Sequence, residues 1–575
     1  MSEYSLKDLE RLHDTGLISH LDYYFAITMA SIFKDATHLA TISAALVSQA
    51  LTNGHVCLDL NRTASTIIHT SDGTSVLTLP GLTDWVADLS ATQMVALENK
   101  QSSSNRWISR QPLILDRDNN LYLAKYYDFQ CRLARNIRNR TENHAGAIDQ
   151  SFIAEGVNRH FSQHDSNQTV GQQEAVKKAL THNFVVISGG PGTGKTYITD
   201  IICSLLDEWA QDNGLDKPKV ISLAPTGKAA SRLSNGATIH SVLKPKKEGV
   251  GFLHTQDNPL DADMVIVDEA SMIDIALMTR LLEAIPLNTR VVLLGDKHQL
   301  SPVQAGAVFT DICQAVSMAG YRTFLDFNFR SKGKTGIENL ARAVNESDKI
   351  ALTQILTSGK YADIVYEDTG HPGGFQKVLK RHIISGYKEL TWAQSPAHAL
   401  ACIDRFRILC AHNSGNNGTL QINHLCEKVL RASLEDGIKG SVFKQLLMVR
   451  QNDYHKGLFN GDTGVVMQVG NKAHAWFTGE NSKLREFRVP DLPSHDPAFA
   501  VTIHKSQGSE FDTVLILIPE RISPVVTRQL LYTGITRARK KVVIIGRLDI
   551  IQAAMETPVE CRSNLVAVLD DELAS

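Results

Sequence analysis

The sequence predicts an α/β protein in which parallel β-sheets are covered by helices on both faces. The first observation is a series of short apolar, β-branched runs that alternate with helical segments from about residue 165 onward. Such runs are typical of parallel strands buried on both faces. They occupy residues 184–187, 220–223, 264–267, 291–294, 514–518 and 542–545. The second observation is a glycine-rich sequence directly after the first run, where folds of this class carry a phosphate-binding loop.

Length and composition limit the class of protein. The chain has 575 residues, of which 43% are hydrophobic, with 59 Lys and Arg against 61 Asp and Glu. These values exclude a disordered chain, a collagen-like repeat and a disulfide-rich miniprotein, and they predict about three or four domains. A net charge of −2 gives no global sign of nucleic-acid binding, although it is compatible with a local basic groove.

The sequence carries no signal for a membrane or for secretion. No apolar run reaches the roughly 18 residues of a membrane-spanning helix, and the N-terminus lacks the basic and apolar regions of a signal peptide. The eight cysteines are scattered without a Cys-x-x-Cys pair, which favours buried thiols in a reducing compartment over a metal site. We therefore expect a cytoplasmic protein without membrane contact.

Two segments outside the alternating pattern contribute to the domain plan. Residues 1 to about 110 contain helical patterns and a short β element, but no catalytic constellation. An aromatic stretch at 122–129 then leads into a helix-like series of arginines, namely Arg132, Arg135, Arg138 and Arg140. This series is compatible with contact to nucleic acid or a partner, but a solvated helix face is the favoured interpretation. Residues 440–489 are rich in strand and turn signals and predict a small β insertion.

The glycine-rich sequence has the spacing of a nucleotide phosphate loop. Its residues are Gly189, Gly190, Pro191, Gly192, Thr193, Gly194, Lys195 and Thr196. Glycines allow backbone N–H groups to surround phosphates, and the N-terminus of the following helix adds positive potential. We expect Lys195 to reach the β- and γ-phosphates of ATP, and Thr196 to bind Mg²⁺. The strand before the loop and the helix after it argue against a chance match.

Two adjacent acids, Asp268 and Glu269, follow the apolar run 264–267. Open α/β sheets bind ligands at the carboxyl ends of their strands, where these acids would lie. We expect Asp268 to hold Mg²⁺ and Glu269 to polarise the attacking water. Taken alone, an acidic pair at a strand end is more often a solvated turn, but the upstream phosphate loop favours ATP hydrolysis.

Seven further sequences resemble, in order, the motifs of superfamily 1 helicases. They lie at residues 172–176, 223–233, 237–241, 294–303, 327–331, 501–511 and 531–539. The first is similar to the glutamine motif that reads adenine, and the others are similar to motifs Ia, Ib, III, IV, V and VI. Their variants most resemble the RecD family, the α subunits of exodeoxyribonuclease V (the RecBCD complex), as do the strings at 187–195, 408–415 and 452–462. The resemblance covers residues 165–575 and continues weakly into the N-terminal part.

The resemblance implies roles for individual residues. Gln172 would read adenine, Glu510 would contact the ribose, and Gln299 would sense the γ-phosphate and relay its loss. Arg330 and Arg537 occupy arginine-finger positions, where a delocalised cation stabilises charge during phosphoryl transfer. Sequence-independent contacts to a DNA strand suit hydroxyl, ammonium and imidazole groups on loops at strand ends. The candidates are Thr226, Lys228, Thr238, His240, Thr502 and His504.

The implied architecture has two RecA-like P-loop NTPase domains and a mainly helical N-terminal domain. Its parts are an N-terminal subunit-docking domain at 1–110, a helical connection at 111–164, a first RecA-like domain at 165–320 with a strand-separating hairpin at 243–260, a second RecA-like domain at 321–435 and 492–575, and an SH3-like β insertion at 436–491.

The implied function is that of an ATP-driven 5′→3′ single-stranded DNA translocase and helicase with ATP and Mg²⁺ as cofactors. As a RecD subunit, the chain would act with RecB-like and RecC-like subunits in a heterotrimer that processes double-strand breaks, and its N-terminal domain would dock on the RecC-like partner. Two alternatives stay open. One is a free-standing helicase of the same branch, and the other is an ATP-gated regulatory DNA-binding subunit that drives no unwinding. A nuclease centre is expected on another subunit.

Overall fold

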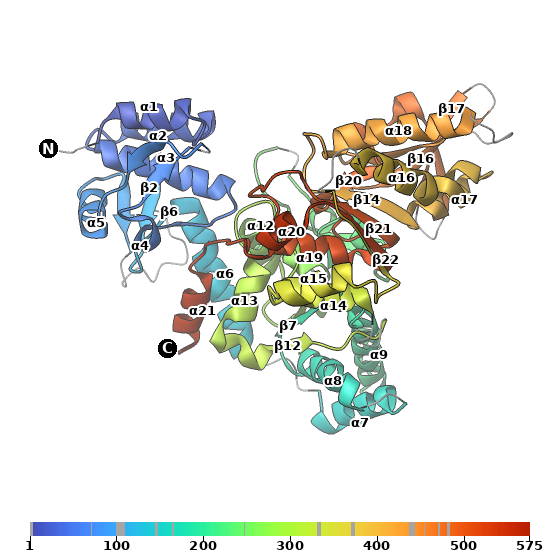
Figure 1. Cartoon of the computed structure of the whole chain (residues 1–575). Helices are drawn as coiled ribbons and strands as arrows, with labels where there is room; N and C mark the ends of the chain where they lie inside the picture. The colour runs from blue at the N-terminus through green and yellow to red at the C-terminus, as the bar shows by residue number, and fades with distance from the viewer. Residues whose placement is uncertain are drawn as a thin grey trace.

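A computed structural model describes residues 4–70, 72–98, 110–143, 146, 148–163, 166–246, 248–330, 335–369, 374–435, 443–453, 455–469, 472–479 and 483–574. Figure 1 shows a smaller N-terminal unit beside two larger α/β units, with the C-terminus near the N-terminal unit. None of the described helices is long and apolar enough to cross a membrane.

The N-terminal unit packs helices against a four-stranded sheet of order β1-β6-β5-β4. Its helices are α1 (Leu6–Asp14), α2 (His20–Ile32), α3 (His38–Thr52), α4 (Leu60–Thr63) and α5 (Leu82–Ser90). Its strands are β1 (Leu58–Asp59), β4 (Val95–Leu97), β5 (Leu113–Leu115) and β6 (Asn120–Leu123), with a separate hairpin of β2 (Ile67–His69) and β3 (Ser75–Thr78). Almost every side chain of α3 from 39 to 50 is buried, so this helix forms the core of the unit.

The first α/β unit is built on a parallel sheet of order β12-β7-β11-β10-β8-β9. Its strands are β7 (Phe184–Gly189), β8 (Val220–Ala224), β9 (Ala237–Thr238), β10 (Met264–Val267), β11 (Arg290–Gly295) and β12 (Arg322–Leu325). Its helices are α6 (Ala124–Glu142), α7 (Gln150–Phe161), α8 (Ser166–Thr181), α9 (Lys195–Asp212), α10 (Gly227–Ala230), α11 (Ile239–Leu243), α12 (Ile275–Ala284) and α13 (Val308–Gln314).

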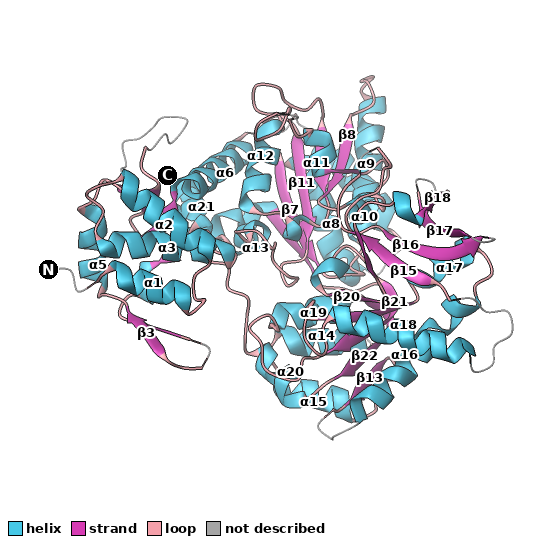
Figure 2. Cartoon of the chain, turned by 90° about the horizontal axis from the view of Figure 1, so that it is seen from above, coloured by secondary structure: helices cyan, strands magenta, loops and turns pink. Residues whose placement is uncertain are grey.

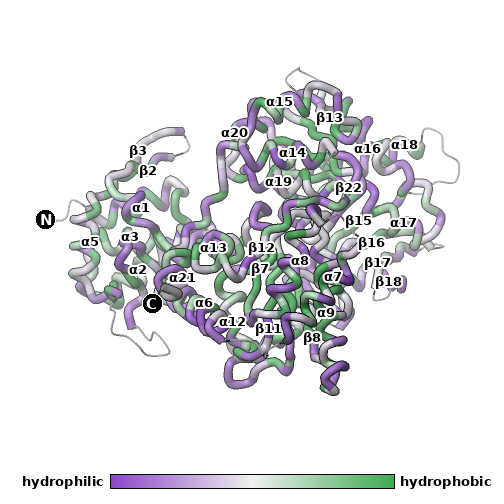
Figure 3. Tube along the Cα trace, turned by 90° about the horizontal axis from the view of Figure 1, so that it is seen from below, coloured by the Kyte–Doolittle hydropathy of each residue, from purple (hydrophilic) through white to green (hydrophobic). Residues whose placement is uncertain are grey.

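Helices cover both faces of this sheet. Successive residues of β7 point to opposite sides: Val185 and Ile187 pack with α7, α8 and α9, whereas Phe184 and Val186 pack with α6, α12 and α13. Figure 3 shows apolar residues in green along the central strands of this unit. The predicted parallel sheet, buried on both faces, is therefore confirmed.

The second α/β unit repeats this design with a parallel sheet of order β13-β22-β21-β14-β20. Its strands are β13 (Ile364–Glu367), β14 (Phe406–Cys410), β20 (Ala500–Thr502), β21 (Phe511–Leu517) and β22 (Ala538–Ile545). Its helices are α14 (Gly336–Asn345), α15 (Lys349–Thr357), α16 (Gly374–Trp392), α17 (Pro396–Ile403), α18 (Thr419–Glu435), α19 (Arg528–Thr536) and α20 (Leu548–Met555). Figure 2 shows the two sheets as separate groups of strands.

An antiparallel sheet of order β18-β17-β16-β15-β19 interrupts the second unit. Its strands are β15 (Gln445–Val449), β16 (Thr463–Val469), β17 (Lys472–Thr478), β18 (Leu484–Arg488) and β19 (His495–Pro497). This is the predicted β insertion, whose likeness to an SH3 fold stays a prediction. The start proposed at residue 436 lies outside the described residues. Within 243–260, an antiparallel bridge joins Pro245 to Phe252.

Strand pairing changes three of the predicted domain limits. The first unit does not end at 320, because β12 pairs in parallel with β7 through residues 322–325. The insertion does not end at 491, because β19 pairs with β15. The N-terminal unit does not end at 110, because β5 and β6 complete its sheet. In each case a short strand continues a sheet across the proposed limit, and strand partners distant in sequence cannot be recognised from local patterns.

The arginine series of α6 does not form a solvated face. Arg140 is fully buried and donates to the carbonyl oxygens of Leu282, in the last turn of α12, and of Ile285, Pro286 and Thr289, which follow that helix. Burial lowers its pKa to about 10. A buried cation that satisfies helix-terminal carbonyls stabilises the junction of α6 and α12, so this arginine is structural.

The C-terminal segment returns from the second unit to the other two. After α20, the Arg562 carbonyl accepts from Val56 N at 2.7 Å, and Asn564 Nδ2 donates to Asp118 at 2.7 Å. Helix α21 (Leu565–Ala574) then lies beside α6 and α13, with Leu569 fully buried (Figures 1 and 2). Residues from about 557 onward therefore connect all three units, rather than belonging to the second RecA-like domain alone.

Asp311, which binds Ser563 of the C-terminal segment, should make the thermal stability of the protein depend on pH. This buried carboxyl on α13 accepts from Ser563 Oγ at 2.7 Å, and burial raises its pKa to about 7. The folded state thus binds a proton that the unfolded chain, with an aspartate pKa of about 3.9, has already released. We expect the Tm to fall as pH rises from about 4 to about 7. In the Asp311→Asn variant, the Tm should change less with pH over this range. Scanning calorimetry tests this, with exposed Asp571→Asn as control; equal slopes in both variants would contradict it.

Candidate active site

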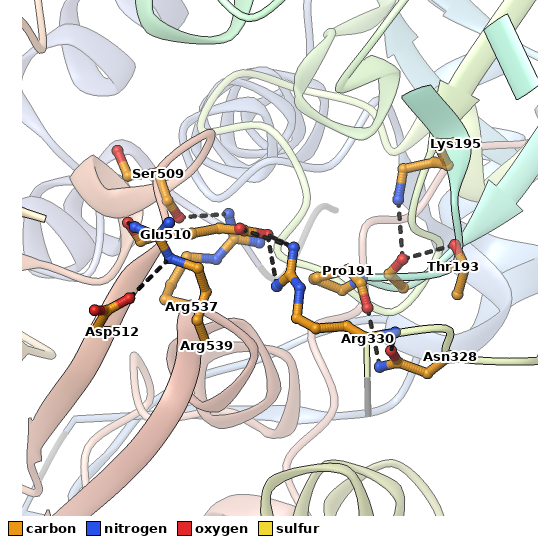
Figure 4. A network of polar contacts seen from close by, with 11 residues as sticks. Pro191, Thr193, Lys195, Asn328, Arg330, Ser509, Glu510, Asp512, Arg537 and Arg539 are labelled. Atoms are coloured by element: carbon orange, nitrogen blue, oxygen red, sulfur yellow. Dashed lines mark hydrogen bonds and ion pairs between the residues drawn. The ribbon is translucent and has the colours of Figure 1, made fainter. Parts of the chain in front are cut away.

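The phosphate loop connects β7 to α9 with the expected strand-loop-helix geometry. Gly192 and Gly194 have φ values of 83° and 86°, a region that residues with a side chain rarely adopt. Lys195 Nζ donates to the carbonyl oxygens of Gly189 and Gly190 at 2.6 and 3.1 Å, so the ammonium group is folded over the loop (Figure 4). Thr196 follows in the first turn of α9. The loop therefore has the backbone geometry of a phosphate-binding loop.

Two segments lie against the outer side of this loop. Gln172, on α8, is buried and its Nε2 donates to the Thr193 carbonyl at 2.9 Å. After β12, Asn328 Nδ2 donates to the Pro191 carbonyl at 3.1 Å, and Phe329 N donates to the Gly192 carbonyl at 2.9 Å. The expected adenine-reading glutamine thus contacts the loop backbone here. The contact of 328–329 was not predicted, because nothing local in that segment points to a distant loop.

The two acids stand at the carboxyl end of β10. Glu269 has a φ of 52°, and its backbone N–H donates to Asp268 Oδ1 at 2.9 Å. Burial raises the pKa of Glu269, while the nearby charges of Arg537 and Lys195 oppose that shift. A carboxylate with a raised pKa beside two cations is suited to accept a proton from water. Lys195, Asp268, Glu269 and Arg537 are thus gathered into one site.

Two arginines lie at this site, Arg330 in the segment after β12 and Arg537 at the C-terminal end of α19 in the second unit. Arg330 forms a bidentate ion pair with Glu510, with Nη2 to Oε2 at 3.0 Å (Figure 4). Arg537 is 2% exposed, and it donates from Nε to the Thr533 carbonyl and from Nη1 to the Ser509 carbonyl. Its Nη2 has no hydrogen-bond partner among the described residues. The expected ribose contact and one expected arginine finger are therefore paired with each other, whereas Arg537 keeps a free donor.

Gln299 supplies a complementary unpaired acceptor. Its Nε2 donates to Asp296 Oδ2 at 3.2 Å, while its buried Oε1 has no partner among the described residues. A buried polar group without a partner costs free energy unless a ligand or water completes it. The orphaned donor of Arg537 and the orphaned acceptor of Gln299 therefore fit a bound nucleotide and its attacking water.

The oxygen ligands expected for Mg²⁺ come from the same region. The Thr196 hydroxyl and the Asp268 carboxylate are hard ligands that suit this ion, which usually also binds nucleotide phosphates and water. No group of three or more His, Cys, Asp or Glu side chains able to hold a metal occurs within the described residues. A magnesium ion here would therefore depend on the nucleotide for further ligands.

The three candidate DNA-contacting threonines take part in local structure. Thr226 and Thr238 are N-caps, which accept from Ala229 N and Ser241 N at the starts of α10 and α11. Thr502, at the end of β20, is 7% exposed and accepts from Lys505 N at 3.2 Å. A capping hydroxyl is held in a fixed position at a strand end, so Thr226 and Thr238 remain placed for a phosphate contact.

The candidate cation and imidazoles differ in their surroundings. Lys228 lies between the two units, 3.7 Å from Asp404 and 5.5 Å from the centre of the Phe511 ring, and burial lowers its pKa to about 8. His240 is exposed and packs edge-on against Phe252 of the 243–260 segment. His504 is half-buried, and burial lowers its pKa, so it is neutral near pH 7. Of these three, Lys228 is already paired across the interface.

A cavity of about 400 Å³ lies where the second sheet meets the β insertion. Thr502 lines it, together with Asn413, His424 and two cations, Arg450 and Lys505. Both cations pair with Asp496, at 3.5 and 3.1 Å. Neither cation is among the residues predicted from the sequence, and Arg450 belongs to the insertion, so it reaches the motif at 501–511 only in the folded chain.

Family models match three parts of the chain. A model described as "RecBCD enzyme subunit RecD, N-terminal domain" matches residues 14–122, one described as "AAA domain" matches 172–305, and one described as "UvrD-like helicase C-terminal domain" matches 497–545. The N-terminal match ends at the sheet that β5 and β6 complete, in agreement with the unit seen in the structure.

Curated relatives match over almost the whole chain. RecBCD enzyme subunit RecD of Mycolicibacterium smegmatis is 29% identical over 564 residues, covering 94% of this chain and 95% of that protein. RecBCD enzyme subunit RecD of Haemophilus influenzae is 25% identical, covering 98% and 100%. The ATP-dependent RecD2 DNA helicase of Deinococcus radiodurans is 29% identical, covering 68% of this chain but 51% of that protein.

Among solved structures, Bacteroides Pif1 bound to single-stranded DNA matches with a TM-score of 0.38 and 18% identity, covering 71% of this chain and 96% of that one. At 94% and 98% coverage of this chain, the two RecD relatives span its N-terminal unit and both α/β units. The chain is therefore similar to RecD subunits over almost its whole length.

Proposed function

We propose that this chain is an ATP-dependent DNA helicase that serves as the RecD subunit of a RecBCD-like enzyme in double-strand break repair and recombination. The observation that carries the proposal is the site formed by two units, in which Glu269 lies in the field of Lys195 from its own unit and of Arg537 from the second. A site completed only when two units meet couples hydrolysis to their relative motion.

The roles proposed for the chain's residues follow from their chemistry. Lys195 binds the β- and γ-phosphates, Glu269 accepts the proton of the attacking water, and Arg537 stabilises the developing charge. Mg²⁺ would be held by Thr196 and Asp268, and it supplies further positive charge at the phosphates. Arg330 and Glu510 are paired with each other, so a nucleotide that binds the paired guanidinium nitrogens would compete with this carboxylate.

The DNA strand is proposed to cross the carboxyl ends of both sheets. Thr226, Thr238 and His240 of the first unit, and Thr502 and His504 of the second, are hydroxyl or imidazole groups at this level. We add Arg450 and Lys505, since a backbone phosphate would compete with Asp496 for their cations. Lys228 would contribute only after leaving Asp404.

An unwinding assay with 5′-tailed and 3′-tailed duplexes tests the activity and its polarity. Wild-type chain should unwind the 5′-tailed duplex, and Lys195→Gln should abolish unwinding because the phosphates lose their cation. Unwinding that survives Lys195→Gln would refute the motor, and activity confined to 3′ tails would refute the 5′→3′ polarity. Nucleotide hydrolysis without unwinding of either substrate would favour the regulatory alternative.

Association with RecB-like and RecC-like subunits is favoured over a free-standing helicase. RecD subunits match 94% and 98% of this chain, whereas the RecD2 helicase matches 68% of it and contains a further half of its own. The proposed setting is the cytoplasm, where such a complex meets chromosomal DNA ends. Gel filtration of the chain with and without the two partners distinguishes the two cases.

Helix α2 offers a docking face for the RecC-like partner. Leu21, Tyr24 and Ile32 are 73%, 63% and 61% exposed, an unusual degree for apolar side chains on one helix. We expect the double variant Leu21→Lys/Tyr24→Lys to bind the RecC-like partner more than about tenfold more weakly. The substitutions put charge in place of apolar area that the complex would bury. The matched control is Leu215→Lys, an exposed leucine of the first unit. Equal partner affinity of both variants in titration calorimetry would refute this face.

A further inference from the structure

Tyr532 connects the two α/β units through a buried hydrogen bond. It belongs to α19 of the second unit, and its hydroxyl donates to Asp296 Oδ2, just after β11 of the first unit, at 3.0 Å. The two residues are 6% and 2% exposed. A hydrogen bond to a carboxylate shielded from water is stronger than a neutral one in solvent. The contact therefore constrains how the units meet.

The same segment of the first unit is held at two more points. Leu300 N donates to Thr533 Oγ1 at 3.0 Å, and the Leu300 carbonyl accepts from Gln507 Nε2 at 3.2 Å. Residues 296–300 are thus bound by the second unit at both of their ends. A movement of α19 would therefore also move the side chains of residues 296–300, including Gln299.

The segment carries the unpaired acceptor of the nucleotide site. Asp296 Oδ2 accepts from Gln299 Nε2 as well as from Tyr532, and this leaves Gln299 Oε1 buried without a partner. The hydroxyl also lies against the phosphate loop, because a Cβ added at Gly190 would be 3.1 Å from Tyr532 Oη. The tyrosine therefore contacts both the phosphate loop and the carboxylate that binds Gln299.

We propose that Tyr532 is a positioning residue for ATP hydrolysis, which fixes Asp296 and through it orients Gln299 when the two units close. The inference rests on the proposed function. Because the hydroxyl donates its hydrogen bond to Asp296 and not to an atom of the phosphate loop, its loss should lower kcat and leave KM for ATP nearly unchanged.

The test is steady-state ATP hydrolysis by the full-length chain with saturating single-stranded DNA. We expect Tyr532→Phe to lower kcat about tenfold, with KM within about twofold, since one hydrogen bond to a charged group is removed. The matched control is Tyr366→Phe, which removes a hydroxyl that donates to the Gly546 carbonyl at 3.0 Å, within the second unit. Its kcat should equal that of wild type.

A double-mutant cycle with Asp296→Asn identifies the partner. The kcat of the double variant should be within about twofold of that of the slower single variant, because either single substitution already breaks the hydrogen bond between Tyr532 and Asp296. Multiplicative effects, an unchanged kcat in Tyr532→Phe, or a rise in KM with a loss of Tm would each overturn the inference. If Tyr532→Phe does not fold, Asp296→Asn must show the same kcat loss at constant KM. A wild-type chain that hydrolyses no ATP would instead refute the proposed function, and the inference with it.

Discussion

Replacing Arg537 by alanine should lower kcat for ATP hydrolysis by about a thousandfold or more, the usual range for an arginine finger. The guanidinium is buried, two of its nitrogens are held by backbone carbonyls, and Nη2 is left without a partner. The group is thus preorganised, and its free donor is available for charge that develops on the phosphate. Arg537→Lys keeps the charge but loses the planar fork, so its kcat should lie between those of the alanine variant and wild type.

The matched control is Arg547→Ala in the same unit. Arg547 is an exposed arginine paired with Asp549, and an exposed ion pair of this kind contributes little. Its kcat should remain within about twofold of wild type, with single-stranded DNA present in all assays. An Arg537→Ala variant that stays folded and hydrolyses ATP within about tenfold of wild type would exclude this side chain from the transition state.

Replacing Glu269 by glutamine should lower kcat by about 10²- to 10⁴-fold, the range for loss of a general base. Glutamine has nearly the same shape but cannot accept the proton of the attacking water. Since the phosphate loop is untouched, ATP should still bind, and the variant should remain on single-stranded DNA in the ATP-bound form. Fluorescent nucleotide binding and single-turnover hydrolysis separate these two effects, with exposed Glu155→Gln as control. Loss of nucleotide binding in Glu269→Gln would contradict the assigned role.

The same carboxyl predicts the pH dependence of hydrolysis. Burial raises the pKa of Glu269, and only the ionised form can act as a base. The rate should therefore fall as pH is lowered, along an acidic limb whose midpoint lies above the ordinary glutamate value of about 4.3. The residual activity of Glu269→Gln should lack this limb. A limb that persists unchanged in the variant would assign it to another group.

The predictions that the structure confirms concern backbone geometry encoded within a few neighbouring residues. The strand 184–187, the loop and the helix from Lys195 lie within about 30 positions, so local geometry follows from glycine spacing and apolar pattern. The parallel sheets were likewise predictable, because a strand covered on both faces needs a continuous apolar run. The predicted domain limits were less accurate, because β12 and β19 are short strands that pair with strands distant in the sequence.

Contacts between segments distant in the sequence could not be predicted from local sequence patterns. The sequence could place Lys228 and Arg330 in motifs, but it could not show that each is paired with an acid from a distant segment, Asp404 and Glu510 respectively. It also could not distinguish Arg140, buried against helix-terminal carbonyls, from an arginine exposed to solvent. Partner choice depends on which surfaces meet, and this is fixed by packing of whole units.

By itself, the sequence determined that this protein has a phosphate loop, an acidic pair after a buried strand, and two sheets built to be covered by helices. These properties arise from backbone geometry and side-chain period over short stretches. Only the tertiary structure decided that Arg537 enters the site of the other unit with a free donor, that Tyr532 binds Asp296, and that the C-terminal helix returns to α6. Those contacts join residues up to about 450 positions apart, and such pairings exist only once the units have packed together.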